Sequence, residues 1–176
     1  MGNVHIRLAS IADIGSIQTM ADNVFRHTYR NIITPEQMEF MMEWMYSTDS
    51  LTEQMNNGHI YSIISADGQD VGYVSINKEQ EGEDGTTLFH LQKIYVLPEM
   101  QGNGLGAKLL LHAEEQMLGL TDGGRVRYEL NVNRNNKAVD FYKRMGMHKD
   151  RTGDFPIGNG FYMNDYIMAK EISKKA

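Results

Sequence analysis

Residues 91–106 read LQKIYVLPEMQGNGLG, and this stretch decides the fold: a strand-like apolar segment ends in a glycine-rich turn that opens directly into an amphipathic helix. Gly102, Gly104 and Gly106 lack Cβ atoms, so their backbone can approach a ligand closely. The unpaired N–H groups of the helix's first turn point at whatever occupies the loop. The stretch therefore predicts an anion site, for which a phosphate or pyrophosphate is the natural occupant.

The spacing of the loop excludes two common nucleotide motifs. A Walker-type loop needs Gly-Lys followed by Ser or Thr, whereas Ala107 and Lys108 are followed here by Leu109, which has no hydroxyl for magnesium. The dinucleotide fingerprint needs glycines at its first, third and sixth positions, and here they stand at the first, third and fifth. That fingerprint also belongs early in a βαβ fold, whereas this loop is central.

Length, charge and composition narrow the class of protein. A chain of 176 residues can form one domain with a real core, so we expect a single domain over residues 1–176. The net charge of −6 argues against a nucleic-acid partner and suits a cationic substrate, although it is also ordinary for a soluble protein. The absence of cysteine excludes disulfides, thiolate zinc sites and a cysteine nucleophile. No export signal or membrane span is indicated, so we expect a cytoplasmic protein.

The rest of the chain alternates between strand and helix patterns. The expected strands span residues 4–8, 60–65, 71–77, 88–97, 126–132 and 161–170. The expected helices run from a Ser10 cap to about Phe25, from Pro35 through Met45, over 51–55, from Leu105 to near Asp122, and over 136–145.

Local residues support several of these boundaries. Ser10 with Asp13 resembles a capping box, and Thr34 before Pro35 is a helix N-cap followed by a favoured first residue. Asp67-Gly68 between two apolar runs predicts a hairpin.

Two segments allow two interpretations each. The Met38, Met41, Met42 and Met45 side chains are expected to face inward as core, and an adaptable substrate face is the alternative. The acidic stretch from Glu79 to Gly85 is expected to be a solvated loop, and a cation-collecting loop is the alternative.

The glycine loop resembles a signature of a known family. QGNGLG at residues 101–106 matches the Gln/Arg-x-x-Gly-x-Gly/Ala signature of the GCN5-related N-acetyltransferases, the GNAT superfamily. The signature follows a strand, precedes a long helix, and is succeeded by the second family pattern, NNKAVDFYKRMGM at residues 135–147. The resemblance implies an α/β (α+β) GNAT fold, with a central mixed six- to seven-stranded twisted sheet, helices on both faces, and splayed central parallel strands.

The resemblance also implies acetyl-CoA as co-substrate, with no metal. In the family, acetyl-CoA lies where the two central parallel strands splay apart, and helix dipole and amides hold its pyrophosphate. The residues implied to contact it are Ile94, Tyr95 and Val96 on the strand, Gln101, Gly102, Asn103, Gly104, Leu105, Gly106 and Ala107 in the loop, and Asn135 and Tyr142 beyond it.

Family position implies the catalytic groups. Tyr142, at the start of the following helix, is the implied general acid, since a phenol with an ordinary pKa near 10 is protonated at neutral pH. The backbone N–H near Val96 is the implied oxyanion donor. Where many members carry a glutamate as base, this chain has His90 and Gln92. An imidazole can accept a proton at neutral pH and an amide cannot, which favours His90; Glu79, Glu81 or water are the alternatives.

A narrower resemblance concerns the acceptor. Thr28-Tyr29, the Met-rich helix and the ending at 162–170 look like the PaiA-like branch, bacterial acetyltransferases associated with spermidine and spermine. This implies a polyamine acceptor near Thr28, Tyr29, His90 and Gln92, and acidic residues such as Glu36, Glu39, Glu43 and Asp49 suit a polycation. Another small amine, an amino acid or a protein N-terminus are alternative acceptors.

Two other classes of function stay open from the sequence. One is a non-catalytic acyl-CoA-binding sensor module, and the other is a structural partner that docks through its Met-rich helices. Family members are often dimers, so the resemblance implies a homodimer. We expect neither a nucleic-acid nor a membrane partner.

Overall fold

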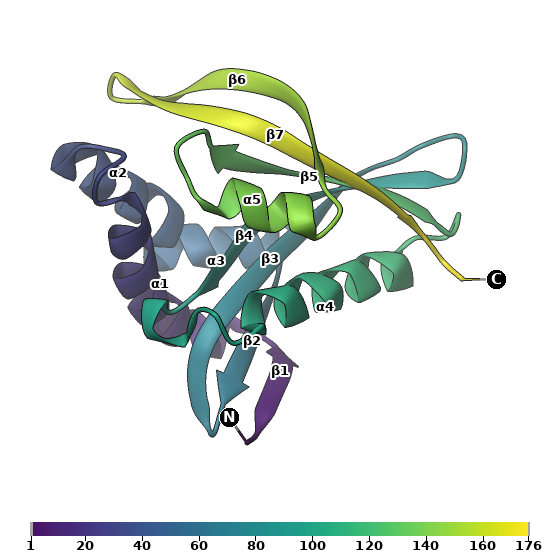
Figure 1. Cartoon of the computed structure of the whole chain (residues 1–176), viewed down its shortest axis with the longest axis horizontal. Helices are drawn as coiled ribbons and strands as arrows, with labels where there is room; N and C mark the ends of the chain where they lie inside the picture. Colours follow the sequence, from purple (N-terminus) through teal and green to yellow (C-terminus); the bar gives the residue numbers. More distant parts are fainter. Residues whose placement is uncertain (1, 176) are drawn as a thin grey trace. The chain divides into compact units, whose positions relative to one another are not determined.

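The computed structural model describes residues 2–175 and contains both strands and helices (Figure 1). The strands are β1 (Val4–Leu8), β2 (Ile60–Ala66), β3 (Gln69–Glu81), β4 (Thr86–Val96), β5 (Arg125–Asn133), β6 (His148–Gly158) and β7 (Phe161–Ser173). The α-helices are α1 (Ile14–Tyr29), α2 (Pro35–Tyr46), α3 (Thr48–Asn56), α4 (Leu105–Leu120) and α5 (Ala138–Arg144). Two 3₁₀ turns, η1 (Ile11–Asp13) and η2 (Pro98–Met100), precede α1 and the glycine loop.

The described strands form one mixed sheet in the order β1-β2-β3-β4-β5-β7-β6. β4 and β5 are parallel neighbours, and their register joins Thr86–His90 to Arg125–Glu129. The pairs β1–β2, β2–β3, β5–β7 and β6–β7 are antiparallel. A seven-stranded mixed sheet with a central parallel pair confirms the predicted α/β fold.

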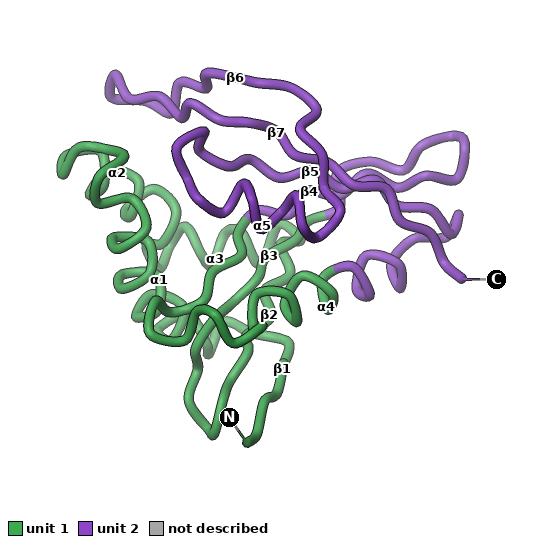
Figure 2. The backbone as a smooth tube through the Cα atoms, viewed as in Figure 1, with its two compact units in different colours: residues 1–77, 93–113 green, residues 78–92, 114–176 purple. Residues whose placement is uncertain are grey.

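The residues group into two compact units (Figure 2). Unit 1 comprises the chain up to residue 77 and residues 93–113, and unit 2 comprises residues 78–92 and the chain from residue 114. The chain passes from one unit to the other within β3, β4 and α4. The single domain expected over 1–176 stays a prediction.

The local signals read from the sequence explain how the elements of unit 1 begin. The side chain of Thr34 accepts a hydrogen bond from the Gln37 amide at 3.1 Å and so caps α2. Asp67 and Gly68 both adopt positive φ, 51° and 82°, which is the geometry of a tight hairpin turn between β2 and β3. The apolar face of α1 is buried and includes Ile14, Ile17, Met20, Ala21 and Val24.

The Met-rich helix α2 divides its methionines between two environments. Met38 and Met41 are buried, in agreement with the core interpretation. Met42 and Met45 are only partly buried, and Met42 lines a surface groove. The expectation that all four face inward is therefore wrong for this pair.

The structure differs from the sequence-based expectation in two strands. β3 continues to Glu81, so the first part of the acidic stretch at 79–85 is strand and not loop. β6 was not expected, because HKDRTGDFPIG shows no apolar alternation and contains Pro156. Its side chains are mostly exposed, and it pairs only with β7 at the edge of the sheet, where a strand needs no apolar pattern.

None of the helices within residues 2–175 has both the length and the apolar composition that crossing a bilayer requires.

Candidate active site

The glycine loop connects η2 to α4 within unit 1. Gly102 and Gly104 have φ of +84° and +77°, a conformation that residues with a Cβ adopt only with strain. α4 begins at Leu105, whose side chain is buried, so this residue offers only its backbone to a ligand. The two positive φ values turn the chain sharply from η2 into the first turn of α4.

The amides of this loop are available for a ligand. Within the described chain, none of the N–H groups from Gly102 to Ala107 donates to a backbone or side-chain acceptor, and the first to do so is Lys108, which donates to the Gly104 carbonyl at 3.1 Å. A Cβ built on Gly102 or Gly104 meets no atom within 4 Å, so the space beside both residues is open. Open space beside unpaired amides at a helix N-terminus is the arrangement that binds phosphate oxygens.

Two side chains brace the loop. The Gln101 Nε2 atom donates to the Val96 carbonyl at 3.1 Å, and the Asn103 Nδ2 atom donates to the Met100 carbonyl at 3.1 Å. The Leu97 amide donates to Val71 on β3, which ties the end of β4 to its neighbour. Gln101 and Asn103 thus use their amide nitrogens to shape the turn.

His90 lies on β4 within unit 2, directly opposite Glu129 of β5 in the parallel register. Its Nδ1 atom lies 3.5 Å from the Glu79 Oε1 atom of β3. Burial lowers the pKa of His90 below 6.5, and the Glu129 carboxylate opposes this shift. Glu129 itself pairs with Arg151 at 2.9 Å and with Arg127 at 3.2 Å. The His90 imidazole is therefore neutral at neutral pH and can accept a proton.

Tyr142 also lies in unit 2, one turn into α5, which begins at Ala138 and not at residue 136 as expected. Its side chain is 7% exposed, and its ring contacts the Phe141 ring with centroids 5.4 Å apart. Asn135 precedes this helix, and its amide donates to the Asn133 Oδ1 atom at 2.9 Å in a tight turn.

A buried polar cluster in unit 2 was missed by the sequence analysis. Glu114 of α4 accepts from the Tyr128 hydroxyl at 2.5 Å and from the Lys170 ammonium at 2.8 Å. Burial and the Glu114 carboxylate both raise the pKa of Tyr128. A glutamate in the apolar stripe of α4 is the sequence signal that could have identified the cluster.

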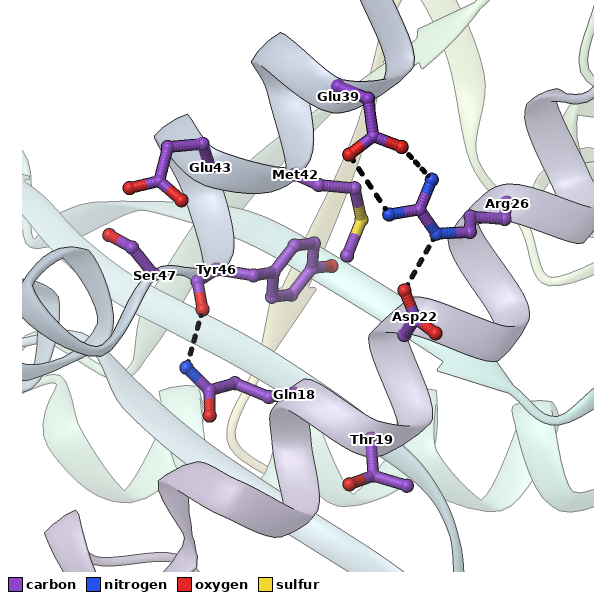
Figure 3. Close-up of a pocket in the computed structure, with 9 residues that line it drawn as sticks. All are labelled: Gln18, Thr19, Asp22, Arg26, Glu39, Met42, Glu43, Tyr46 and Ser47. Atoms are coloured by element: carbon purple, nitrogen blue, oxygen red, sulfur yellow. Dashed lines mark hydrogen bonds and ion pairs between the residues drawn. The ribbon is translucent and has the colours of Figure 1, made fainter. Parts of the chain in front are cut away.

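A groove between α1 and α2 lies within unit 1 (Figure 3). Its volume is about 530 Å³, within the range of about 300–1,000 Å³ typical of small-molecule sites. The lining residues are Gln18, Thr19, Asp22, Arg26, Glu39, Met42, Glu43, Tyr46 and Ser47. Three carboxylates and one guanidinium give the groove an acidic balance.

The Arg26 guanidinium is held by two of these carboxylates. Its Nε atom lies 2.6 Å from Asp22 and its terminal nitrogens bind Glu39 (Figure 3). Glu43 forms no ion pair within the described chain, so its carboxylate is available to a cation. Glu39 and Glu43 were singled out from the sequence; Asp22 and Tyr46 were not.

The residues expected to bind the acceptor fall in both units. Thr28 is partly exposed at the end of α1, and Tyr29 is 8% exposed, with its ring 4.6 Å from that of Phe25. Both belong to unit 1, whereas the partly buried His90 and the exposed Gln92 belong to unit 2.

Comparison with known proteins agrees with this architecture. The acetyltransferase (GNAT) domain family matches residues 29–169. A spermidine N(1)-acetyltransferase of Thermoplasma acidophilum is 25% identical over 96% of this chain and 98% of its own length. An uncharacterised N-acetyltransferase from the pepI 3′ region of Lactobacillus delbrueckii subsp. lactis is 23% identical over 98% of this chain and 99% of its own.

A solved structure has the same fold. The PaiA N-acetyltransferase from Thermoplasma acidophilum, crystallised in complex with coenzyme A, superposes with a TM-score of 0.77 at 24% identity, covering 97% of this chain and 99% of that one.

Proposed function

This chain belongs to the GNAT acetyltransferase family, and from that premise we propose that it moves acetyl directly from acetyl-CoA to a primary amine of a polyamine such as spermidine or spermine. Family membership makes it an acetyl-CoA-dependent N-acetyltransferase. The residue roles and the acceptor are the proposal. The observation that carries it is the glycine loop, with its unpaired amides from Gly102 to Ala107.

The loop is suited to the pyrophosphate of acetyl-CoA. Unpaired amides and the N-terminal end of α4 offer partial positive charge to phosphate oxygens. Open space beside Gly102 and Gly104 lets these oxygens come close to the backbone. Acetyl-CoA supplies the activated acetyl thioester, and Ile94 to Val96 with Asn135 are the proposed contacts for its pantetheine arm.

His90 is the proposed base that takes a proton from the acceptor's ammonium, directly or through water, so that the neutral amine can attack the thioester. Burial keeps its imidazole neutral at neutral pH, which leaves a lone pair to accept that proton. Glu79 and Glu129 lie beside it and favour the imidazolium that results. Glu79 is the alternative base, since burial raises the pKa of its carboxyl group and makes the carboxylate a stronger proton acceptor.

Tyr142 is the proposed acid that protonates the departing thiolate. Its hydroxyl is carried on a side chain that is 7% exposed, so the proton moves in a site with little water. The backbone N–H near Val96 is the proposed donor to the carbonyl oxygen that gains negative charge. The chain has no cysteine to carry acetyl as a thioester, and direct attack of the amine on acetyl-CoA is the proposed route.

A polycationic acceptor is supported by charge and by similarity. The groove between α1 and α2 presents Asp22, Glu39 and the unpaired Glu43. A protein whose name is spermidine N(1)-acetyltransferase is similar over nearly the whole chain. We assign the acceptor's distal ammonium groups to this groove, with Tyr46 and Met42 packing against its methylene segments.

A thiol-release assay tests the proposal. Each reaction contains the protein, acetyl-CoA and one candidate acceptor. The candidates are spermidine, spermine, an amino acid, an aminoglycoside and a peptide with a free N-terminus. Release with the two polyamines at the highest kcat/KM is the expected result. If only another amine supports thiol release, that amine is the acceptor and the polyamine proposal is wrong. If acetyl-CoA binds but no amine supports thiol release, a sensor module is favoured.

Glu43→Gln tests the groove as acceptor site, with Glu36→Gln as a matched control on the same helix but outside the groove lining. We expect Glu43→Gln to raise the KM for spermidine several-fold with kcat unchanged, and Glu36→Gln to change neither. Equal KM values for the two variants would exclude this site.

A further inference from the structure

Lys93 of β4 is a buried cation that the proposed chemistry does not use. Its side chain lies in unit 1 and the residue is 8% exposed. Its Nζ atom donates to the Tyr61 hydroxyl at 2.6 Å, to the Gln54 Oε1 atom at 3.0 Å and to the Met45 carbonyl at 3.4 Å. It also lies 4.5 Å from the centroid of the Tyr46 ring and 5.2 Å from that of Tyr61. One ammonium thus contacts α2, α3 and β2.

The groups around Lys93 do not neutralise its charge. Within residues 2–175, no carboxylate forms an ion pair with it. The titratable groups that face it are the phenols of Tyr46 from α2 and Tyr61 from β2, with Tyr73 of β3 bonded to Tyr46; α3 contributes the neutral Gln54. Burial raises the pKa of all three phenols, so they stay neutral near pH 7. Burial lowers the pKa of Lys93 to about 7, so this lysine is the group of the cluster that titrates there.

The same contacts reach the groove between α1 and α2. Tyr46, whose ring lies under the ammonium, lines the groove, and its carbonyl accepts from the Gln18 side chain of α1 at 2.9 Å. Lys93 donates to the carbonyl of Met45, which is the penultimate residue of α2. The helix dipole favours a positive charge at this end of the helix. Lys93 therefore acts at the end of the helix that forms one wall of the groove.

We propose that Lys93 is a proton-dependent positioning residue, whose amine holds the C-terminal end of α2 and the Tyr46 ring in place and whose protonation loosens that wall of the groove. Burial disfavours the ammonium because no carboxylate of the described chain pairs with it, and the cation–π contacts with Tyr46 and Tyr61 and the attraction to the end of α2 offset only part of that cost. The neutral amine keeps its hydrogen bonds without that cost. The consequence for acceptor affinity rests on the proposed use of the groove as the acceptor site.

Trp44 gives a readout that needs no activity. It is the only tryptophan of the chain, it precedes Met45 on α2, and it is 47% exposed. Its fluorescence is measured from about pH 5.5 to about pH 9 in the wild type, Lys93→Met, Lys93→Arg and two controls. Lys78→Met removes an exposed lysine, and His59→Gln removes the histidine that follows α3.

We expect a transition near pH 7 in the wild type and in both controls. Lys93→Met should show no transition, and Lys93→Arg should keep the low-pH signal throughout, because arginine stays charged. A lysine side-chain carbon resonance that titrates near pH 7 in the wild-type NMR spectrum tests the same point without any variant. A Trp44 transition that survives in Lys93→Met, or the absence of such a resonance, would overturn the proposal.

The kinetic arm separates this inference from the proposed acceptor. We expect the KM for spermidine to fall several-fold in the wild type as pH rises past 7, with no such step in Lys93→Met and with the pH dependence of kcat set by His90 alone. If Trp44 responds to Lys93 but no polyamine is acetylated, the acceptor proposal fails and the lysine proposal stands. If polyamines are acetylated and the KM does not change across the pH range of the Trp44 fluorescence transition, Lys93 has no role in positioning the groove.

Discussion

The Nδ1 atom of His90 lies 3.5 Å from the Oε1 atom of Glu79. Burial acts on the two groups in opposite directions, since it lowers the pKa of the imidazole and raises the pKa of the carboxyl group. Both shifts favour the uncharged forms, and the carboxylate of Glu79 accepts a proton more readily than an ordinary one. Two proton acceptors therefore stand side by side, and kinetics can decide which one acts.

His90→Gln is expected to lower kcat by about 10²-fold, which is the lower end of what a general base contributes. In the wild type, kcat/KM should fall as pH drops through the pKa of His90, which lies below 6.5, because the imidazolium cannot accept a proton. This acidic limb should be absent from the variant. Glu79→Gln serves as the comparison: if it loses the rate and His90→Gln does not, the glutamate is the base.

Tyr142→Phe removes one hydroxyl from a side chain that is 7% exposed and leaves the ring in place. We expect kcat to fall by about 10²-fold while the Kd for acetyl-CoA stays unchanged, because only the proton donor is lost. Stopped-flow thiol release and calorimetry measure the two quantities. Unchanged turnover at every pH would remove Tyr142 from the mechanism.

Gly104→Ala places a Cβ on a residue with φ of +77° in the loop, and Gly68→Ala does the same at +82° in the β2–β3 turn. A Cβ meets no atom within 4 Å at either site, so both variants should lose about 1 kcal/mol of stability through backbone strain alone. Only Gly104→Ala should weaken acetyl-CoA binding. Equal Kd values for the two variants would argue against a ligand at the loop.

The stability of the protein should depend on pH through Lys93. Its pKa is about 7 when folded and near 10.5 when unfolded, so the unfolded chain binds more protons between these values. The free energy of unfolding should therefore rise with pH across that window, by up to about 1.4 kcal/mol per pH unit relative to Lys93→Met. Below about pH 7, Lys93 is protonated in both states and should make no contribution to the pH dependence. Urea denaturation at several pH values measures the difference. Parallel curves for the two proteins would show that Lys93 does not titrate in the window.

Local chemistry made much of this fold predictable. Thr34 caps α2 and Asp67-Gly68 makes the hairpin turn because each depends only on neighbouring residues. The glycine loop could be identified for the same reason, since its positive φ values and free amides are set by a six-residue spacing. The mixed sheet with its central parallel pair followed from the family resemblance and not from any local pattern.

Features that depend on distant residues could not be predicted. β6 is held by β7 and has no apolar pattern of its own. Phe89, Leu91 and Lys93 alternate along β4 and are all buried, so the lysine occupies a position on the buried face of the strand. Its partners Met45, Gln54 and Tyr61 come from other elements, and only the tertiary structure brings them together.

The central claim is that the amides from Gly102 to Ala107 bind the diphosphate of coenzyme A. Amide resonances of isotopically labelled protein, recorded with coenzyme A and separately with pantetheine, test it most directly, because pantetheine lacks the diphosphate. We predict that coenzyme A shifts these resonances strongly and that pantetheine leaves them in place. Binding of coenzyme A with the loop amides unmoved would contradict it.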